Sequence, residues 1–262
     1  MSVSQESVVL AHREDGHPAT PPVMMAPSLG TTWEMWDPVV ASLSSTYRVV
    51  RFDTRGHGRS PVPPPPYTIE AMAEDVIALA DRLGIDRFCF VGLSLGGCIG
   101  QMLGLKHPDR LSALVLCCTL PRFGDSSSWQ QRAAAIRAEG MGVLAEPTRG
   151  RWFTEAFRSS HSDAVERCIE MLTATPVEGY AGCCDALASF DATDDLGRID
   201  VPTRVLVGAE DPVATVELGE RMVAALPDAD LSVIERASHI ACIEQPGVFT
   251  HAVTEHLRRH LP

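Results

Sequence analysis

The sequence predicts an α/β fold, with a mostly parallel central sheet, helices on both faces and a helical insertion. Two observations support this prediction. Short, continuous apolar runs alternate along the chain with segments of helical periodicity, and strands that are apolar on both sides are typical of a parallel sheet covered by helices. The alternation stops near Thr119 and resumes near Val201. We therefore expect a separate segment inserted into the part of the chain that forms the sheet.

Continuous apolar runs mark the expected strands. They are apolar along their length and do not alternate with polar residues, which indicates burial on both faces of a sheet. The expected strands are residues 23–26, 47–52, 88–92, 113–118, 204–208 and 231–234.

Helical patterns separate these runs. In residues 69–83 apolar side chains recur with the helical period, Thr68 can cap the amino terminus, and Gly84 is a stop signal. Further helices are expected at residues 96–106, 216–226 and 247–261. Residues 88–105 are uncharged, but their serine, glutamine and glycines favour a buried strand, a turn and a packed helix over a membrane span.

The insertion is expected over residues 121–198, between core segments 1–120 and 199–262. It contains helical stretches and no convincing strand. Its large apolar residues suggest a helical cap packed over one end of the sheet; they are Trp129, Trp152, Phe153 and Phe157. The proline-rich run 61–66 cannot continue a helix or a strand, so we expect a stiff surface loop.

Composition and charge exclude several classes of protein. The chain has 262 residues, of which 45% are hydrophobic and 21% charged, as in a folded domain and unlike a disordered chain. Its formal net charge of −12 argues against nucleic-acid and anionic-membrane partners, because both favour a basic patch. A homo-oligomer is compatible with the sequence.

Cysteine usage and the amino terminus predict a compartment. The eight cysteines are spread over a long chain and form no C-x-x-C pair, so we expect buried free thiols and no zinc site. The first 15 residues lack a basic region followed by an apolar stretch. No signal peptide is therefore expected, and the prediction is a cytoplasmic protein.

A glycine-flanked serine is the strongest chemical signal. Gly92, Ser94 and Gly96 form a G-x-S-x-G pattern directly after an apolar run and directly before a helix. This context is that of a nucleophile elbow, where a strained turn exposes the serine hydroxyl and neighbouring side chains would collide. We interpret Ser94 as a nucleophile; the alternative is a glycine-rich turn with an incidental serine.

A nucleophilic serine needs a base and an acid that orients it, and in this context both follow the serine in the chain. Asp211 follows the run 204–208 and is the expected acid, with the adjacent Glu210 as its competitor. His239 follows the run 231–234 and is the expected base. His57 precedes the serine and is interpreted as part of a turn. The remaining candidates lie in a terminal helix, in the insertion or at a helix end: His251, His256, His260, His161 and His107.

Acyl transfer also requires N–H groups that stabilise an oxyanion. The residue after the nucleophile supplies one, and the loop after the strand 23–26 supplies the second. We therefore expect the N–H groups of Leu95 and Leu29 to form the oxyanion hole.

Several further motifs carry a resemblance that extends from about Ser28 to the carboxyl terminus. Around the G-L-S-L-G-G turn they are S-L-G-T (28–31), M-W-D-P (35–38), F-D-T-R-G-H-G (52–58), Y-T-I-E (67–70), L-V-L-C (114–117), R-W-F-T (151–154) and G-Y-A-x-C-C (179–184). With these motifs the chain resembles the α/β-hydrolase superfamily and, within it, the 3-oxoadipate enol-lactonases. Pro27 departs from the small polar residue usual in that family.

The resemblance implies hydrolysis of a small anionic enol-lactone to 3-oxoadipate through an acyl-enzyme, with neither a metal nor an organic cofactor. The alternative is a carboxylesterase or lactonase with the same triad and another small ester as substrate. A substrate carboxylate would need a local cation in this acidic protein. The candidates for contact with the substrate are Arg55, Arg132 and Arg151, with Trp129 and Trp152 as walls of the pocket.

Overall fold

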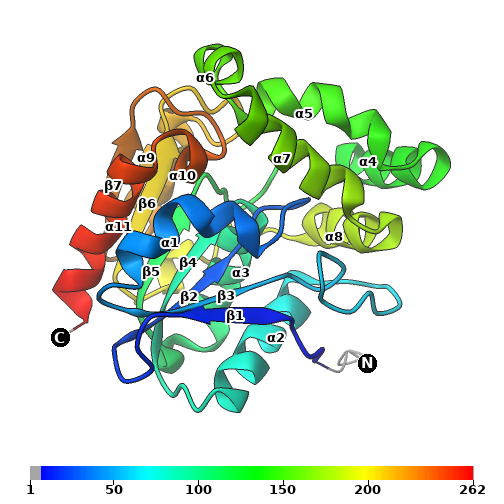
Figure 1. Cartoon of the computed structure of the whole chain (residues 1–262). Coiled ribbons are helices and arrows are strands. Elements are labelled where there is room, and N and C mark those ends of the chain that lie inside the picture. Colours follow the sequence, from blue (N-terminus) through cyan, green and yellow to red (C-terminus); the bar gives the residue numbers. More distant parts are fainter. Residues whose placement is uncertain (1–6, 262) are drawn as a thin grey trace.

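A seven-stranded sheet forms the centre of the molecule. The computed structural model describes residues 7–261, and the strands lie in the order β1-β3-β2-β4-β5-β6-β7 (Figure 1). Neighbours are parallel except for the antiparallel pair β1 and β3. The strands are β1 (His12–Asp15), β2 (Pro22–Ala26), β3 (Arg48–Phe52), β4 (Phe88–Leu93), β5 (Leu111–Cys117), β6 (Thr203–Gly208) and β7 (Ala229–Ile234).

All expected strands are confirmed, with boundaries that differ by at most two residues. The central strand β4 is buried at each position, as its continuous apolar run predicts. Strand β1 is not predicted. Its sequence, His-Arg-Glu-Asp, is entirely polar and pairs only with β3 at the edge of the sheet, so it carries no hydrophobic signal.

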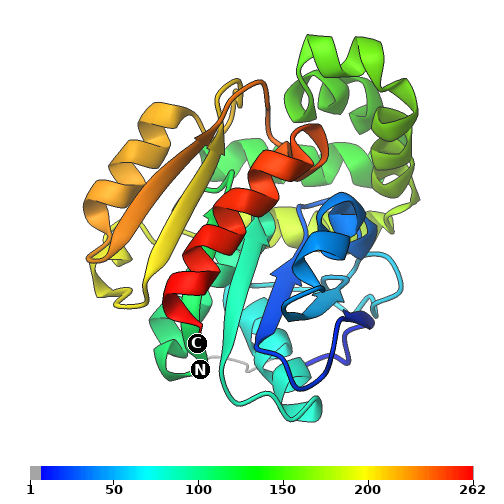
Figure 2. The ribbon, with the colours of Figure 1, turned by 60° about the vertical axis from the view of Figure 1, so that its left-hand side comes forward.

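Helices cover both faces of the sheet (Figure 2). Helix α1 (Asp37–Leu43) packs on α11 (Pro246–His260) on one face, and α2 (Ile69–Arg82) packs on α3 (Leu95–Lys106) on the other. Helix α9 (Val216–Ala225) packs against β6 and β7. The predicted helices α2, α3, α9 and α11 are confirmed, whereas the short α1 and α10 (Ala241–Glu244) are not predicted.

Helix α2 illustrates how the local sequence sets an element. The hydroxyl of Thr68 accepts a hydrogen bond from the Ala71 N–H at 3.0 Å, and Gly84 follows the helix with a φ of +65°. These are the amino-terminal cap and the left-handed stop that the sequence predicts.

Between β5 and β6 the chain forms only helices and turns. The α-helices are α4 (Ser126–Glu139), α5 (Ala145–Trp152), α6 (Glu155–Ser160), α7 (Ser162–Ala174) and α8 (Val177–Ser189). They lie together over one end of the sheet (Figure 1). This segment corresponds to the helical insertion expected at residues 121–198, and we interpret it as a cap on the core.

The uncharged stretch 88–105 forms β4 and most of α3. In residues 7–261 no helix combines the length and apolarity needed to cross a membrane. The first six residues, which belong to the segment searched for a signal peptide, lie outside the described residues. All eight cysteines are buried free thiols.

Candidate active site

Ser94 lies at a sharp turn between β4 and α3. Its φ of 56° and ψ of −110° are unusual for a residue with a side chain. A Cβ at Gly92 would lie 2.1 Å from the carbonyl oxygen of Gly96, and a Cβ at Gly96 would lie 2.3 Å from the carbonyl oxygen of Ala26. The turn therefore requires both glycines, and it places the serine at the amino terminus of α3.

Asp211 and His239 meet beyond the carboxyl ends of β6 and β7. Asp211 Oδ2 lies 2.8 Å from His239 Nδ1, and both side chains are buried. Burial alone would raise the pKa of Asp211, but the charge and hydrogen bond of His239, with backbone N–H groups of residues 213 and 214, lower it. Asp211 is thus held as a carboxylate that can fix the orientation of the imidazole ring. Glu210 is exposed.

The expected oxyanion donors are the backbone N–H groups of Leu29 and Leu95. Leu95 is the first residue of α3, where a backbone N–H has no partner within the helix. Leu29 and Ser94 line the same cavity. In the part of the chain that the structure describes, no acceptor is found for the Leu29 N–H. Both groups are therefore available as donors.

His57 holds the loop that carries Leu29. Its Nε2 accepts a hydrogen bond from the Gly30 N–H at 2.9 Å, and its Nδ1 lies 3.3 Å from the carbonyl oxygen of Arg55. Burial lowers the pKa of His57 to about 4, although the contact with Arg55 opposes this effect. The neutral ring can therefore donate from Nδ1 and accept at Nε2. This contact joins residues 27 positions apart, so sequence reasoning identifies only the local turn.

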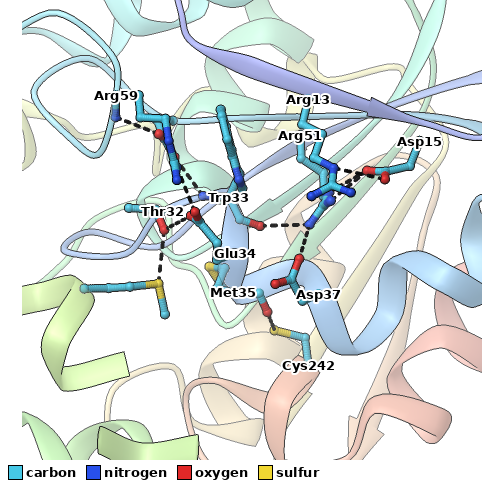
Figure 3. Close-up of polar contacts among 12 residues, drawn as sticks. Arg13, Asp15, Thr32, Trp33, Glu34, Met35, Asp37, Arg51, Arg59 and Cys242 are labelled. Atoms are coloured by element: carbon cyan, nitrogen blue, oxygen red, sulfur yellow. Dashed lines mark hydrogen bonds and ion pairs between the residues drawn. The ribbon is translucent and has the colours of Figure 1, made fainter. Parts of the chain in front are cut away.

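Two arginines, the buried Arg51 and the exposed Arg59, hold the segment that follows the loop carrying Leu29 (Figure 3). Arg51 bonds to Asp15 at 2.7 Å and to Asp37 at 2.5 Å, and also to the carbonyl oxygen of Trp33. Arg59 stacks over the ring of Trp33 and pairs with Glu34 at 2.7 Å. Arg51 and Arg59 thus hold the end of the segment between β2 and α1 through Trp33, Glu34 and the first residue of α1, Asp37.

A cavity of about 730 Å³ lies between the turn at Ser94 and the cap. Ser94 and His239 both line it, together with Leu29. Among the described residues that line it there are four arginines and neither an aspartate nor a glutamate; the arginines are Arg122, Arg132, Arg151 and Arg221. In a chain of net charge −12, this lining favours an anionic ligand.

Two of these arginines are engaged with acids near the rim. Arg122 lies 3.5 Å from Asp191, and Arg221 lies 2.6 Å from Glu217. Both side chains are more than half exposed. Solvent and these neighbours weaken their attraction for a ligand.

Arg132 and Arg151 differ from that pair. Neither forms an ion pair with an acid in residues 7–261. Burial and the nearby charge of Arg132 lower the pKa of Arg151. Arg132 also stacks 4.8 Å from the ring of Trp129. Two neighbouring cations without a counter-ion form a site that a ligand carboxylate would complete.

The expected cap residues Trp129, Arg132, Arg151 and Trp152 all line the cavity, but Arg55 does not. Its guanidinium pairs with the buried carboxylate of Asp75 at 2.6 Å, and both side chains are 1% exposed. The expectation that Arg55 contacts a substrate is therefore wrong, because the charge is already used inside the core. Its position on a loop after a strand does not reveal the partner on α2.

Tyr180 is a cavity residue that the sequence analysis does not single out. It lies on α8 and lines the cavity. Burial raises the pKa of its hydroxyl, although the charge of Arg132 and a hydrogen bond with it oppose this rise. Its presence in the motif G-Y-A is the only sequence signal. Within residues 7–261 no group of three His, Cys, Asp or Glu side chains could hold a metal ion.

Comparison with known proteins agrees with this geometry. The family model described as alpha/beta hydrolase fold matches residues 21–246. The chain belongs to the α/β-hydrolase family. The chain order of nucleophile, acid and histidine in that fold is also the order of Ser94, Asp211 and His239 in this sequence.

Within the family, enol-lactonases and an esterase are similar to this chain. The 3-oxoadipate enol-lactonase 2 of Acinetobacter baylyi is 38% identical over 98% of this chain and 96% of its own. The enol-lactonase structure from Burkholderia xenovorans LB400 superposes with a TM-score of 0.93, at 39% identity, over 95% of this chain and 96% of that one. The malate-bound structure of a thermophilic esterase from Thermogutta terrifontis superposes with a TM-score of 0.92, at 32% identity, over 97% of this chain and 94% of that one.

Proposed function

We propose that this hydrolase opens a small enol-lactone that carries a carboxylate, 3-oxoadipate enol-lactone, through a covalent acyl-enzyme. One observation carries the proposal. Ser94 and His239 line a cavity that has four arginines and no acid among its described lining residues. Asp211 bonds to Nδ1 of His239. The similarity to two enol-lactonases supports the choice of substrate.

In the proposed mechanism Ser94 Oγ attacks the lactone carbonyl carbon while His239 Nε2 takes the hydroxyl proton. Asp211 stabilises the imidazolium that forms, and the Leu29 and Leu95 N–H groups receive the oxyanion. Collapse of the tetrahedral intermediate breaks the ring C–O bond and expels the enol oxygen, which His239 protonates. Water, deprotonated by His239, then attacks the acyl-enzyme and releases the acid and Ser94.

The arginine pair supplies the selectivity in this proposal. A carboxylate placed between Arg132 and Arg151 would gain charge-assisted hydrogen bonds and relieve the repulsion between two cations that face the same cavity. Trp129 and Trp152 would form the apolar walls. The lactone carbonyl then lies toward Ser94 and the carboxylate toward the cap.

Comparing two substrates tests this assignment. Purified protein should hydrolyse the enol-lactone with a higher kcat/KM than neutral p-nitrophenyl esters, followed by loss of lactone absorbance and by nitrophenolate release. Preference for the neutral esters would favour the alternative, a carboxylesterase with the same triad. The similarity to an esterase is the reason to make this comparison.

Arginine variants test the carboxylate site separately. Arg132→Ala and Arg151→Ala should each raise KM for the enol-lactone about tenfold to a hundredfold, the effect of losing one hydrogen bond to a charged group, and change KM for p-nitrophenyl acetate little. Arg137→Ala is the matched control, because Arg137 lies on the same helix as Arg132 but pairs with Glu178 and Asp185. Equal KM changes for both substrates would refute the carboxylate site.

A further inference from the structure

The loop that carries His239 is joined to the cap by direct hydrogen bonds. The Ile240 N–H donates to the carbonyl oxygen of Trp152 at 3.1 Å. The Ser238 hydroxyl donates to the carbonyl oxygen of Arg151, also at 3.1 Å. The residues on either side of His239 therefore bond to Arg151 and Trp152, two cap residues that line the same cavity as His239.

Glu244 lies at the centre of this junction. Its Oε1 accepts the N–H and the hydroxyl of Thr154, each at 2.8 Å, and its Oε2 accepts the Ser238 N–H at 2.5 Å. One carboxylate at the end of α10 thus binds the cap segment with one oxygen and the histidine loop with the other.

The surroundings of Glu244 fit an ionised acceptor. The residue is 6% exposed, and no arginine, lysine or histidine in residues 7–261 forms an ion pair with it. Burial raises its pKa, and the hydrogen bonds from Ser238 and Thr154 oppose that rise. Burial of a carboxylate without a cation costs free energy. The three hydrogen bonds to Glu244 compensate part of this cost.

We propose that Glu244 is a positioning residue that locks residues 151–154 of the cap to the loop carrying His239. This inference rests on the proposed function, because it gives the lock a role in catalysis. While Glu244 bonds to both segments, the distance between the His239 imidazole and the cap at Arg151 stays constant. A substrate bound by the cap is therefore held at a fixed distance from the base.

Loss of this lock should affect catalysis through geometry. Glu244→Ala leaves three buried donors without an acceptor, which loosens both segments. A misplacement of about 1 Å can lower turnover a hundredfold, so kcat should fall about tenfold to a hundredfold for the enol-lactone and for p-nitrophenyl acetate. KM should rise for the lactone only, because only the lactone uses the arginines.

Two variants and a second readout make the test specific. Glu244→Gln keeps one acceptor oxygen but turns an NH₂ group toward a donor, so its kcat should lie between those of wild type and Glu244→Ala. Glu235→Gln is the matched control, since Glu235 is an exposed acid after β7 in the same connection. Hydrogen exchange at the amides of Thr154, Ser238 and Ile240 should accelerate together in Glu244→Ala and stay unchanged in Glu235→Gln.

The outcomes separate this proposal from the proposed function. If wild type does not open the lactone but hydrolyses p-nitrophenyl acetate, the substrate assignment fails and the ester and exchange measurements still test Glu244. A folded Glu244→Ala protein with wild-type kcat for the ester would overturn the proposal. So would a lower melting temperature without any change in kcat or in exchange at these three amides, because Glu244 would then only stabilise the fold.

Discussion

At the scale of single residues, two adjacent acids have different surroundings. Asp211 is buried and bonded to His239, whereas Glu210 points to solvent. Both oxygens of Asp211 have partners, since Oδ1 accepts the Val213 N–H at 2.8 Å. The sequence favours Asp211 but places both acids after the same strand; the structure separates them, because only the Asp211 side chain is directed to His239.

Replacing each acid by its amide should show this difference. Asp211→Asn keeps the shape but cannot hold the same imidazole tautomer, so kcat should fall on the order of ten-thousandfold, as for the corresponding change in a serine protease. Glu210→Gln should leave kcat within a factor of about two. Steady-state hydrolysis of p-nitrophenyl acetate measures both variants, and the reverse pattern would make Glu210 the acid.

Residue-level chemistry is predictable where its signal is local. The elbow around Ser94 can be recognised because glycines, strand and helix are adjacent in the chain. The buried pair of Arg55 and Asp75, the His57 contact with Gly30 and the position of Tyr180 arise from packing between distant segments. No local pattern specifies them.

At the scale of elements, a close backbone contact joins the cap to the core. A Cβ at Gly179, near the start of α8, would lie 2.0 Å from the carbonyl oxygen of Gly56. Gly150 lies within α5 and has no atom within 4 Å of the corresponding position. The two helical glycines therefore have different reasons to be present.

Alanine substitution should change stability in opposite directions. Gly179→Ala forces backbone apart and should lower the free energy of unfolding by about 1–3 kcal/mol. Gly150→Ala should raise it by about 0.5–1 kcal/mol, because alanine favours the helix and meets no obstacle. Urea unfolding followed by circular dichroism measures both. Equal effects would contradict the close contact between α8 and the loop at Gly56.

Elements are predicted well where hydrophobic periodicity or burial is strong. The buried strands and the long helices of the core are of this kind. Strand β1 and helix α1 are short, and β1 is polar. Their formation depends on contacts with β3 and α11. These partners are distant in the chain, so a local stretch of sequence gives no signal for them.

At the scale of the whole molecule, buried histidines couple folding to pH. Burial lowers the pKa of both His57 and His256 to about 4, from an ordinary value near 6.5. In the unfolded chain these rings bind protons below about pH 6.5. The unfolded state therefore takes up more protons between about pH 6.5 and 4, and the free energy of unfolding falls as pH is lowered through this window.

Each histidine should remove roughly 2 kcal/mol of stability between pH 7.5 and pH 5.0. His256→Gln isolates one of them, since glutamine can still donate to the carbonyl oxygen of Pro202, the contact of His256 Nε2. Urea unfolding of wild type and variant at both pH values should show a smaller loss in the variant, by that amount. Identical losses would show that His256 does not stay neutral in the folded protein.

The charge distribution of the whole chain also bears on function. A net charge of −12 repels an anion at long range, whereas the arginines that line the cavity place positive charge next to it. The arginines can be named from the sequence, but the absence of acids among the described lining residues emerges only when the cap is placed over the sheet.

We infer that His239 makes the Ser94 hydroxyl nucleophilic, and covalent labelling measures this reactivity. A fluorophosphonate probe should add once to the wild-type chain, at Ser94, with a rate that His239→Ala lowers at least a thousandfold. Mass spectrometry of intact protein and peptides locates the adduct. Labelling of Ser94→Ala at the wild-type rate, or a wild-type adduct at another residue, would show that Ser94 is not the nucleophile.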